Sequence, residues 1–191
     1  MSLSEIVDNS KTDKNTVHSY LELYQKLLHK KKETARNVLE IGVNQGGSIK
    51  LWHDFFTNAT IYGLDIIPIT QMWSDIKNNN RIKLGRFDAY NVKFFTNNFL
   101  NKNIQFDFML DDGPHTLESM KQFIRLYSKV MTNDGILIIE DIQSIDWINI
   151  LYNEVPENLK PFVKVYDLRY IKNRYDDIVF TIDKTNIQCL V

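Results

Sequence analysis

The sequence predicts an α/β protein built on a doubly wound, mostly parallel sheet, and three observations support this prediction. Between residues 37 and 140, five short apolar runs alternate with segments of helical periodicity. That alternation is typical of βαβ units, whose sheet is covered by helices on both faces. After residue 160, two more apolar runs joined by a polar segment predict an antiparallel hairpin at the sheet edge. The length of 191 residues suits one domain, so we expect residues 1–191 to form a single unit.

The chain is expected to begin with a helical arm over residues 1–35. Its apolar residues are spaced by three and four, as on one face of a helix. They are Val17, Tyr20, Leu21, Tyr24, Leu27 and Leu28. Three lysines at 30–32 follow and suit the negative end of the helix dipole. The arm is therefore predicted to contain one amphipathic helix that precedes the first strand.

Each predicted strand is a short apolar run bounded by turn-forming residues. The parallel strands are predicted at 37–41, 60–65, 81–85, 105–110 and 135–140, and the hairpin at 162–168 and 177–182. Asn133-Asp134-Gly135 predicts a turn before the fifth strand. Helices are predicted at 48–56, 73–78, 92–100, 117–131 and 145–152. The segment 117–131 has the clearest period of 3.6 residues.

Composition and charge argue against several classes of protein. With 23 basic and 24 acidic residues the net charge is -1, whereas nucleic-acid binders usually need a basic surface. No run approaches the ~20 apolar residues of a membrane span, and the first 15 residues lack the apolar core of a signal peptide. The single Cys189 excludes an internal disulfide framework and a Cys-based zinc site. We therefore expect a cytoplasmic protein with neither nucleic-acid nor membrane partners.

In a doubly wound sheet, ligands bind beyond the carboxyl ends of the strands, and acidic residues follow every predicted parallel strand. They are Glu40, Asp65, Asp88, Asp111 with Asp112, and Glu140 with Asp141. A single acid at a strand end can also cap a helix or form a turn. Acids at all five strand ends instead predict a functional edge.

The loop after the first strand predicts a nucleoside site. Gly42 and Gly46 allow the backbone to approach a ligand, but Asn44 takes the place of the second glycine of a dinucleotide fingerprint. Asp65 lies 23 residues after Gly42, near the ~20-residue offset at which an acid reaches a ribose diol. Glu40 would repel a phosphate and attract an ammonium group. A nucleoside with an amino-acid tail, S-adenosylmethionine, fits these features.

A second constellation predicts a metal site. Asp112, Glu140 and Asp141 converge if the fourth and fifth strands are neighbours. Like charges this close raise each other's pKa unless a cation joins them, and oxygen ligands select Mg²⁺, Mn²⁺ or Ca²⁺ over zinc. The alternative is that the acids cap helices, with Asp112 serving the helix that begins near residue 116.

His115 is a candidate general base. It lies three residues after Asp112, at the predicted start of a helix. The positive helix end lowers a histidine pKa, so the neutral ring would be ready to accept a proton. The alternative is a structural hydrogen-bond donor.

These motifs resemble those of class I S-adenosylmethionine-dependent methyltransferases, with their Rossmann-like sheet. More narrowly, they resemble the metal-dependent sugar O-methyltransferases of macrolide biosynthesis, of the macrocin and mycinose type. The segments that carry the resemblance are Val38-Leu-Glu-Ile-Gly42 with Gly46-Gly47-Ser48, Asp111-Asp112-Gly113-Pro114-His115 with Glu140-Asp141, and Thr12-Asp13-Lys14 with His18-Ser19-Tyr20. Together they span about residues 10 to 145.

The resemblance implies a role for each matching position. Metal ligands would be Asp112, Glu140 and Asp141, with His115 as general base beside Asp112. Cofactor contacts would come from Glu40 and Gly42 near the methionine portion, from Asp65 on the ribose and from Asp88 near the adenine. Asn44 and Gly46 of the glycine loop would also contact the cofactor. Lys14 and Tyr20 lie on the arm, which would fold over the cleft and touch cofactor or substrate.

The sequence therefore favours Mg²⁺- or Mn²⁺-dependent methyl transfer from S-adenosylmethionine to a sugar hydroxyl, on a nucleotide-linked or glycan deoxysugar. Alternatives are a catechol-type O-methyltransferase acting on a small vicinal diol, an NAD-binding enzyme of the same fold, and an inactive scaffold. Arg169 and Arg174 would either bind a substrate phosphate or pair with Asp167 and Asp176. The acceptor and the oligomeric state, a homo-oligomer included, are left open.

Overall fold

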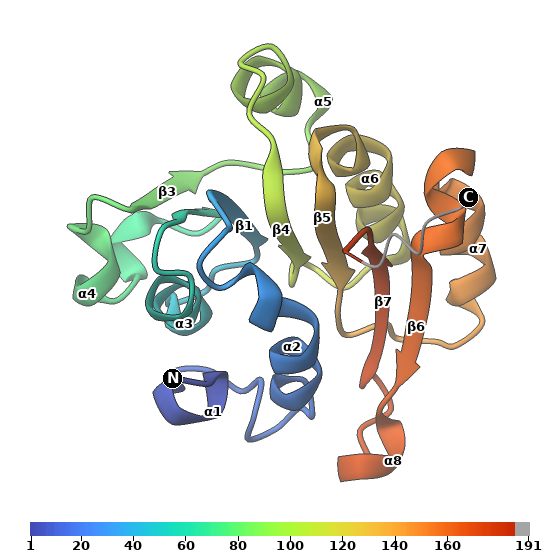
Figure 1. The fold of residues 1–191 in the computed structure, drawn as a ribbon, viewed down its shortest axis with the longest axis horizontal. Coiled ribbons are helices and arrows are strands. Elements are labelled where there is room, and N and C mark those ends of the chain that lie inside the picture. Colours follow the sequence, from blue (N-terminus) through green and yellow to red (C-terminus); the bar gives the residue numbers. More distant parts are fainter. Residues whose placement is uncertain (186–191) are drawn as a thin grey trace.

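A seven-stranded sheet forms the centre of the molecule (Figure 1), which we describe from a computed structural model for residues 1–185. Cys189 lies outside the described residues. In sheet order the strands are β3 Ile82–Arg86, β2 Thr60–Asp65, β1 Asn37–Ile41, β4 Phe106–Asp111, β5 Met131–Ile139, β7 Ile178–Asp183 and β6 Val163–Asp167. The first five are parallel, and β7 runs antiparallel to both β5 and β6. The predicted doubly wound sheet with an antiparallel C-terminal edge is confirmed.

The helices cover both faces of this sheet. In chain order they are α1 Leu3–Ile6, α2 Leu21–Leu28, α3 Gly47–Phe55, α4 Ser74–Lys77, α5 Val92–Phe95 with a π-helical turn Thr96–Leu100, α6 Leu117–Tyr127, α7 Trp147–Glu154 and α8 Arg169–Lys172. Successive strand residues point to opposite faces, so Val38 packs with α2 and α3 while Leu39 packs with α6 and α7. The core therefore consists of two apolar layers that share the sheet.

Strand order changes direction between β1 and β4, which are neighbours in the sheet although β2 and β3 lie between them in the chain. The connections from β1 and β4 leave on opposite faces at this point, so a crevice opens beyond the carboxyl ends of the two strands. The candidate residues after β1, β2, β3, β4 and β5 therefore face one edge of the molecule.

The arm differs from its prediction. The helix begins at Leu21 rather than near Val17, which is 44% exposed. Residues 14–20 instead form turns, in which the backbone N–H of Tyr20 donates to the carbonyl of Lys14. This path turns the Lys14 side chain inward, where it is buried. A helix that began near Val17 would have placed that residue on the apolar face. The turn instead directs the Lys14 ammonium toward Asp112 and Glu140, with which it forms ion pairs.

The predicted turn at Asn133-Asp134-Gly135 lies inside β5 and is corrected to a bulge. Met131 pairs with Phe106, but Ile136 pairs with Phe108, so the residues between them are extra on the β5 side. The predicted helix 117–131 ends at Tyr127, and a 3-10 turn leads into β5. Helix α8 interrupts the loop of the C-terminal hairpin. None of the described helices has both the length and the apolar character to cross a membrane.

Candidate active site

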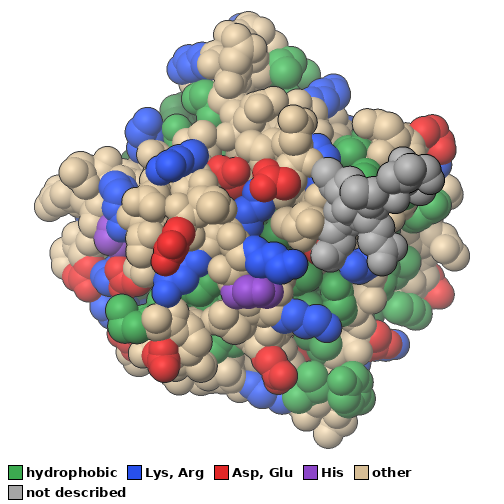
Figure 2. Space-filling model, in the orientation of Figure 1, with side chains coloured by type: hydrophobic (Ala, Val, Ile, Leu, Met, Phe, Trp, Pro, Cys, Tyr) green, Lys and Arg blue, Asp and Glu red, His purple; other side chains and the backbone are tan. Residues whose placement is uncertain are grey.

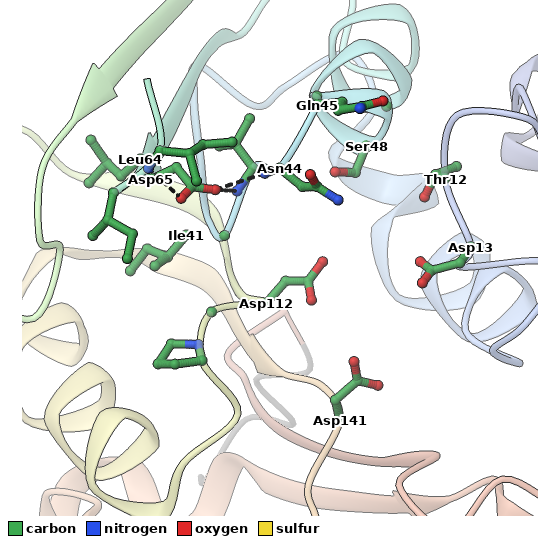
Figure 3. Close-up of a pocket in the computed structure, with 18 of the residues that line it drawn as sticks. Thr12, Asp13, Ile41, Asn44, Gln45, Ser48, Leu64, Asp65, Asp112 and Asp141 are labelled. Carbon is green, nitrogen blue, oxygen red and sulfur yellow. Dashed lines mark hydrogen bonds between the residues drawn. The ribbon is translucent and has the colours of Figure 1, made fainter. Parts of the chain in front are cut away.

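A cavity of about 960 Å³ lies at the carboxyl ends of the parallel strands (Figure 3). Its walls come from the loop after β1, the ends of β2 and β3, the loop after β4, the start of the segment after β5, and the arm. The arm contributes Asn9, Ser10, Lys11, Thr12, Asp13 and Thr16. A protein pocket of this size holds a cofactor or drug-sized molecule. The expectation that the arm folds over the cleft is met by this geometry.

Asp65 fastens the glycine loop to the end of β2. Its Oδ2 accepts hydrogen bonds from the backbone N–H groups of Val43 and Asn44, both at 2.8 Å, and Oδ1 accepts from Ile67 at 3.1 Å. Figure 3 draws these bonds to the loop. Asn44 has a left-handed backbone (φ 49°), which its place in the tight loop requires. Asp65 therefore shapes the loop and also lines the cavity.

Gly42 and Gly46 hold positions that a side chain would disrupt. Both have left-handed backbones, with φ of 87° and 93°. A Cβ on Gly42 would lie 1.7 Å from the backbone oxygen of Asp112, so the loops after β1 and β4 touch only because this residue is glycine. Gly46 is the N-cap of α3. Gly42 thereby lets the loop after β1 pack against the segment that carries Asp112 and His115, and Gly46 lets the same loop pack against Ile76.

Glu40 lies behind the cavity wall rather than on it. It is fully buried, and its two oxygens accept hydrogen bonds from Ser48 Oγ and Trp52 Nε1. Burial raises the pKa of Glu40 to about 7. Of its two partners Ser48 is the one that lines the cavity. In this arrangement Glu40 supports the wall through Ser48, and its contact with a ligand ammonium group stays a prediction.

Lys14 enters the carboxylate cluster from the arm. Its Nζ lies 2.7 Å from Asp112 Oδ2 and also donates to Glu140 Oε1, while the other Glu140 oxygen accepts from the Tyr24 hydroxyl. Burial opposes the charge on Lys14, but Asp112 and Glu140 raise its pKa well above the ordinary value. Lys14 is therefore an internal counter-ion of the cluster, and its contact with cofactor or substrate stays a prediction.

Asp141 is held by two other arm residues. Its Oδ1 accepts from the Tyr20 hydroxyl and lies 3.2 Å from His18 Nδ1. Burial raises the pKa of Asp141. Tyr20 is fully buried, so it meets Asp141 rather than the cavity. A contact of Tyr20 with cofactor or substrate stays a prediction.

Asp112, His115 and Asp141 converge. One ligand atom from each lies within 4.8 Å of the others, with His115 Nε2 at 3.2 Å from Asp112 Oδ1 and 3.6 Å from Asp141 Oδ2. Figure 3 shows Asp112 and Asp141 projecting into one part of the cavity from separate strand ends. His115 and Asp141 both have left-handed backbones, with φ of 52° and 56°. Such strain in non-glycine residues is concentrated at functional sites. Glu140, the third predicted metal ligand, is turned toward Lys14 and Tyr24.

Asp112 does not cap helix α6, which was the alternative role considered for it. Thr116 is the N-cap of α6, and its hydroxyl accepts from the backbone N–H of Ser119. Lys14 and His115 lower the pKa of Asp112 to about 2, against the effect of burial. The hydrogen bond with Asp112 raises the pKa of His115. This direction is opposite to the lowering of the pKa expected from the helix end, because the carboxylates of Asp112 and Asp141 lie 3.2 and 3.6 Å from Nε2.

Several residues of this site were not singled out from the sequence. Ile66 and Phe87, 70% and 52% exposed, are apolar side chains on the cavity wall beside Asp65 and Asp88. An apolar residue within two positions of the end of a predicted strand, where a turn-forming residue is expected, is a signal that could have found them. His18 lies in the arm segment that carries the resemblance, and Tyr24 lies on the predicted helix face. Neither was given a role in the site, since their partners are distant in the chain. Asp88 lines the cavity, and its Oδ1 accepts from the backbone N–H of Tyr90.

The two C-terminal arginines are paired with nearby acids. Arg169 binds both oxygens of Asp167, at 2.7 and 2.8 Å, and Arg174 lies 3.0 Å from Asp176 Oδ2. Of the two roles considered for these arginines, the structure shows the ion pairs with Asp167 and Asp176.

The chain is similar in sequence to sugar O-methyltransferases, although no model of a known protein family matches it. The mycinamicin VI 2''-O-methyltransferase of Micromonospora griseorubida is 30% identical over 118 residues, which are 58% of this chain and 28% of that protein. The L-olivosyl-oleandolide 3-O-methyltransferase of Streptomyces antibioticus is 25% identical over 138 residues, or 69% and 34%. The demethylmacrocin O-methyltransferase of Streptomyces fradiae is 26% identical over 153 residues, or 76% and 37%. The chain thus spans about a third of the length of these relatives.

Solved structures show the same fold. The MycE methyltransferase of the mycinamycin biosynthetic pathway, in complex with Mg and SAH, superposes with a TM-score of 0.75 at 20% identity. The match covers all of this chain and 57% of that one. A fibrillarin pre-rRNA processing protein of Methanococcus jannaschii gives a TM-score of 0.60 at 13% identity, covering 81% and 69%. The chain has the class I methyltransferase fold.

Proposed function

We propose that this protein is an S-adenosylmethionine-dependent O-methyltransferase that methylates a sugar hydroxyl with the help of a divalent cation. The observation that carries the proposal is the convergence of Asp112, His115 and Asp141 at the mouth of a cavity built on the glycine loop. Its sequence relatives are named as sugar O-methyltransferases, which favours a sugar acceptor over the vicinal aromatic diol of a catechol-type enzyme.

The residues present fit a hard divalent cation. Asp112 Oδ1 and Asp141 Oδ2 face the same point, and carboxylate oxygens are the ligands that Mg²⁺ and Mn²⁺ prefer. When bound there, the cation would neutralise the pair and stabilise negative charge developing on an acceptor oxygen. Glu140 completes the predicted triad in sequence, but its oxygens are engaged by Lys14 and Tyr24. We therefore place the cation on Asp112 and Asp141, with Glu140 behind them.

The cavity also fits the cofactor. Its volume of about 960 Å³ accommodates a nucleoside with an amino-acid tail. Asp65 offers a carboxylate where a ribose would lie, and Ile66 and Phe87 offer apolar surface beside it for a base. Asp88 also lines the cavity, which supports the proposal that it lies near the adenine. The cofactor supplies a methyl group on a sulfonium, whose sulfur keeps the electron pair of the broken C–S bond.

In the proposed mechanism, His115 Nε2–H donates to Asp112, and the other ring nitrogen, Nδ1, takes the proton of the acceptor hydroxyl as its oxygen bonds to the methyl carbon. Asp112 accepts a hydrogen bond from the ring and holds it toward the reacting oxygen. The cavity walls align the acceptor with the methyl group, and such positioning supplies much of the rate in a simple displacement. The arm residues Lys11 to Asp13 close the opposite side and limit access of water.

A two-part experiment on His115→Ala tests these roles. We expect methyl transfer to a sugar or nucleotide-sugar panel to fall by at least 100-fold, while binding of S-adenosylhomocysteine and of Mn²⁺, measured by calorimetry, stays near wild type. Loss of Mn²⁺ binding would instead make His115 a ligand and overturn its role as base. Wild-type protein that methylates catechols but no sugar would overturn the acceptor class, and NAD binding without S-adenosylhomocysteine binding would overturn the reaction.

A further inference from the structure

Each carboxylate of the Asp112–Asp141 pair has one oxygen bound by the N-terminal arm. Lys14 Nζ lies 2.7 Å from Asp112 Oδ2, and the Tyr20 hydroxyl donates to Asp141 Oδ1. His18 Nδ1 lies 3.2 Å from the same Asp141 oxygen. The remaining oxygens, Asp112 Oδ1 and Asp141 Oδ2, are the two that face His115. The arm thus leaves one oxygen of each acid turned to the candidate cation site.

The groups that hold Asp141 are themselves fixed. The rings of His18 and Tyr20 stack, with centroids 4.9 Å apart and planes at 17°. Asp177, fully buried just before β7, lies 2.7 Å from His18 Nδ1 and accepts from the Ser19 backbone N–H at 3.1 Å. Because two carboxylate oxygens flank Nδ1, this nitrogen carries a proton and donates. A continuous set of contacts therefore runs from the start of β7 through His18 to Asp141.

We infer that Tyr20 and His18 are positioning residues, which orient the Asp141 carboxylate for the divalent cation. The inference rests on the proposed function and adds two residues of the arm to it. Asp141 lies in the loop two residues after the end of β5 and has a left-handed backbone, so the regular geometry of a strand does not set the direction of its side chain. Bonds to Oδ1 fix the rotation of the carboxylate and leave Oδ2 free for the cation. Removing such partners of a metal ligand costs about 10- to 100-fold in metal affinity.

A matched pair of substitutions tests this with the metal alone. Tyr20→Phe removes the hydroxyl on Asp141, whereas Tyr24→Phe removes a buried hydroxyl of the same arm that donates to Glu140. We expect Tyr20→Phe to weaken Mn²⁺ binding about 10-fold or more, measured by electron paramagnetic resonance on the whole chain, and Tyr24→Phe to leave it unchanged. Wild-type affinity in Tyr20→Phe, or equal losses in both variants, would overturn the inference.

Substitutions at His18 provide a second, independent measurement. Asparagine keeps an N–H donor near the place of Nδ1, and alanine does not. We expect His18→Ala to lose Mn²⁺ affinity about 10-fold and His18→Asn to recover most of it, with S-adenosylhomocysteine affinity and thermal unfolding showing that each variant is folded. No difference between the two variants would contradict the role of His18.

Wild-type protein that fails to bind Mn²⁺ overturns both the proposed function and this inference. If the wild-type protein binds Mn²⁺ and the substitutions at Tyr20 and His18 leave its affinity unchanged, only the inference is overturned.

Discussion

At the scale of single residues, Lys14 determines the charge balance of the site. Its ammonium is almost fully buried between Asp112 and Glu140, which lie 98 and 126 residues further along the chain. A buried ion pair is expensive to form but more expensive to break, because the remaining charge has lost its water without gaining a partner. The side chain therefore contributes to folding as well as to the chemistry of the cluster.

We predict that Lys14→Met lowers the free energy of unfolding by about 3–5 kcal/mol near pH 8. The loss should be smaller near pH 5, because burial already raises the pKa of Glu140 and its neutral form needs no counter-ion. Urea unfolding at the two pH values measures both effects. Lys11→Met is the control, since its pair with Asp75 at 3.1 Å is partly exposed and should contribute about 1 kcal/mol or less. Equal losses from the two substitutions would contradict the internal role of Lys14.

Glu40 predicts a pH dependence of stability. Its pKa is about 7 in the folded protein and about 4.3 in an unfolded chain, so between these values the folded state keeps a proton that the unfolded state has lost. This contribution to the free energy of unfolding is present below the unfolded pKa and is lost as the pH rises toward 7. Glu40→Gln should remove that part of the slope between pH 5 and 7 in urea unfolding. Glu118→Gln, on the exposed surface of α6, should keep the wild-type slope, and the same slope in Glu40→Gln and wild type would show the idea to be wrong.

At the scale of elements, helix starts decide which acids are free for chemistry. Helix α6 is capped by its own Thr116 and Ser119, so the loop before it can turn Asp112 and His115 toward the cavity. The strand order has the same consequence, because β4 lies between β1 and β5 and brings the acids of three strands to one edge. Helix capping and strand pairing thus bring the acidic residues of the site together without a bound ligand.

We predict that Thr116→Ala lowers the free energy of unfolding by about 1 kcal/mol through loss of the cap. The matched control is Asp146→Ala, because Asp146 is the N-cap of α7 but makes no side-chain cap hydrogen bond within the described part of the chain. The control should lose clearly less in the same urea titration. If Asp146→Ala lowers the free energy of unfolding as much as Thr116→Ala does, the capping hydrogen bond of α6 does not account for the effect of Thr116→Ala.

At the scale of the whole molecule, the arm belongs to the same core as the sheet. Tyr20, Tyr24 and Leu28 pack in one apolar cluster with Val38 of β1 and Phe108 of β4. On the face shown in Figure 2, acidic and basic side chains are interspersed rather than gathered over separate parts of the chain. The arm therefore has the contacts of an integral part of the domain.

We predict a single cooperative unfolding transition for the arm and the sheet. Circular dichroism and tryptophan fluorescence should give the same midpoint in urea, as in other two-state domains. Native-state hydrogen exchange adds a local test: the Tyr24 amide, bonded to the carbonyl of Tyr20, should exchange with about the same free energy as amides of β4. If the Tyr24 amide exchanges with a much smaller free energy of opening than amides of β4, the arm unfolds separately, and residues 1–191 are not one cooperative unit.

The sequence by itself determined the local features of this protein. Strands β1 to β5, the helices between them and the acidic residues at the strand ends follow from hydrophobic periodicity and turn residues, which act over a few positions. The glycine loop after β1, and His115 beside the acids after β4, were predictable because each directly follows a predicted strand. The bulge in β5 was not, because Asn-Asp-Gly has the same local preferences in a turn and in a bulge.

Only the tertiary structure decided which partner each acid of the site receives. Glu140 meets Lys14 and Tyr24, and Asp141 meets Tyr20 and His18, across more than 100 residues of chain. Spacing in the sequence carries no information about such contacts, since they depend on how the turn at residues 14–20 directs its side chains into the crevice. The acids were therefore predictable as a group, whereas their separate roles depend on the packing of the arm against the sheet.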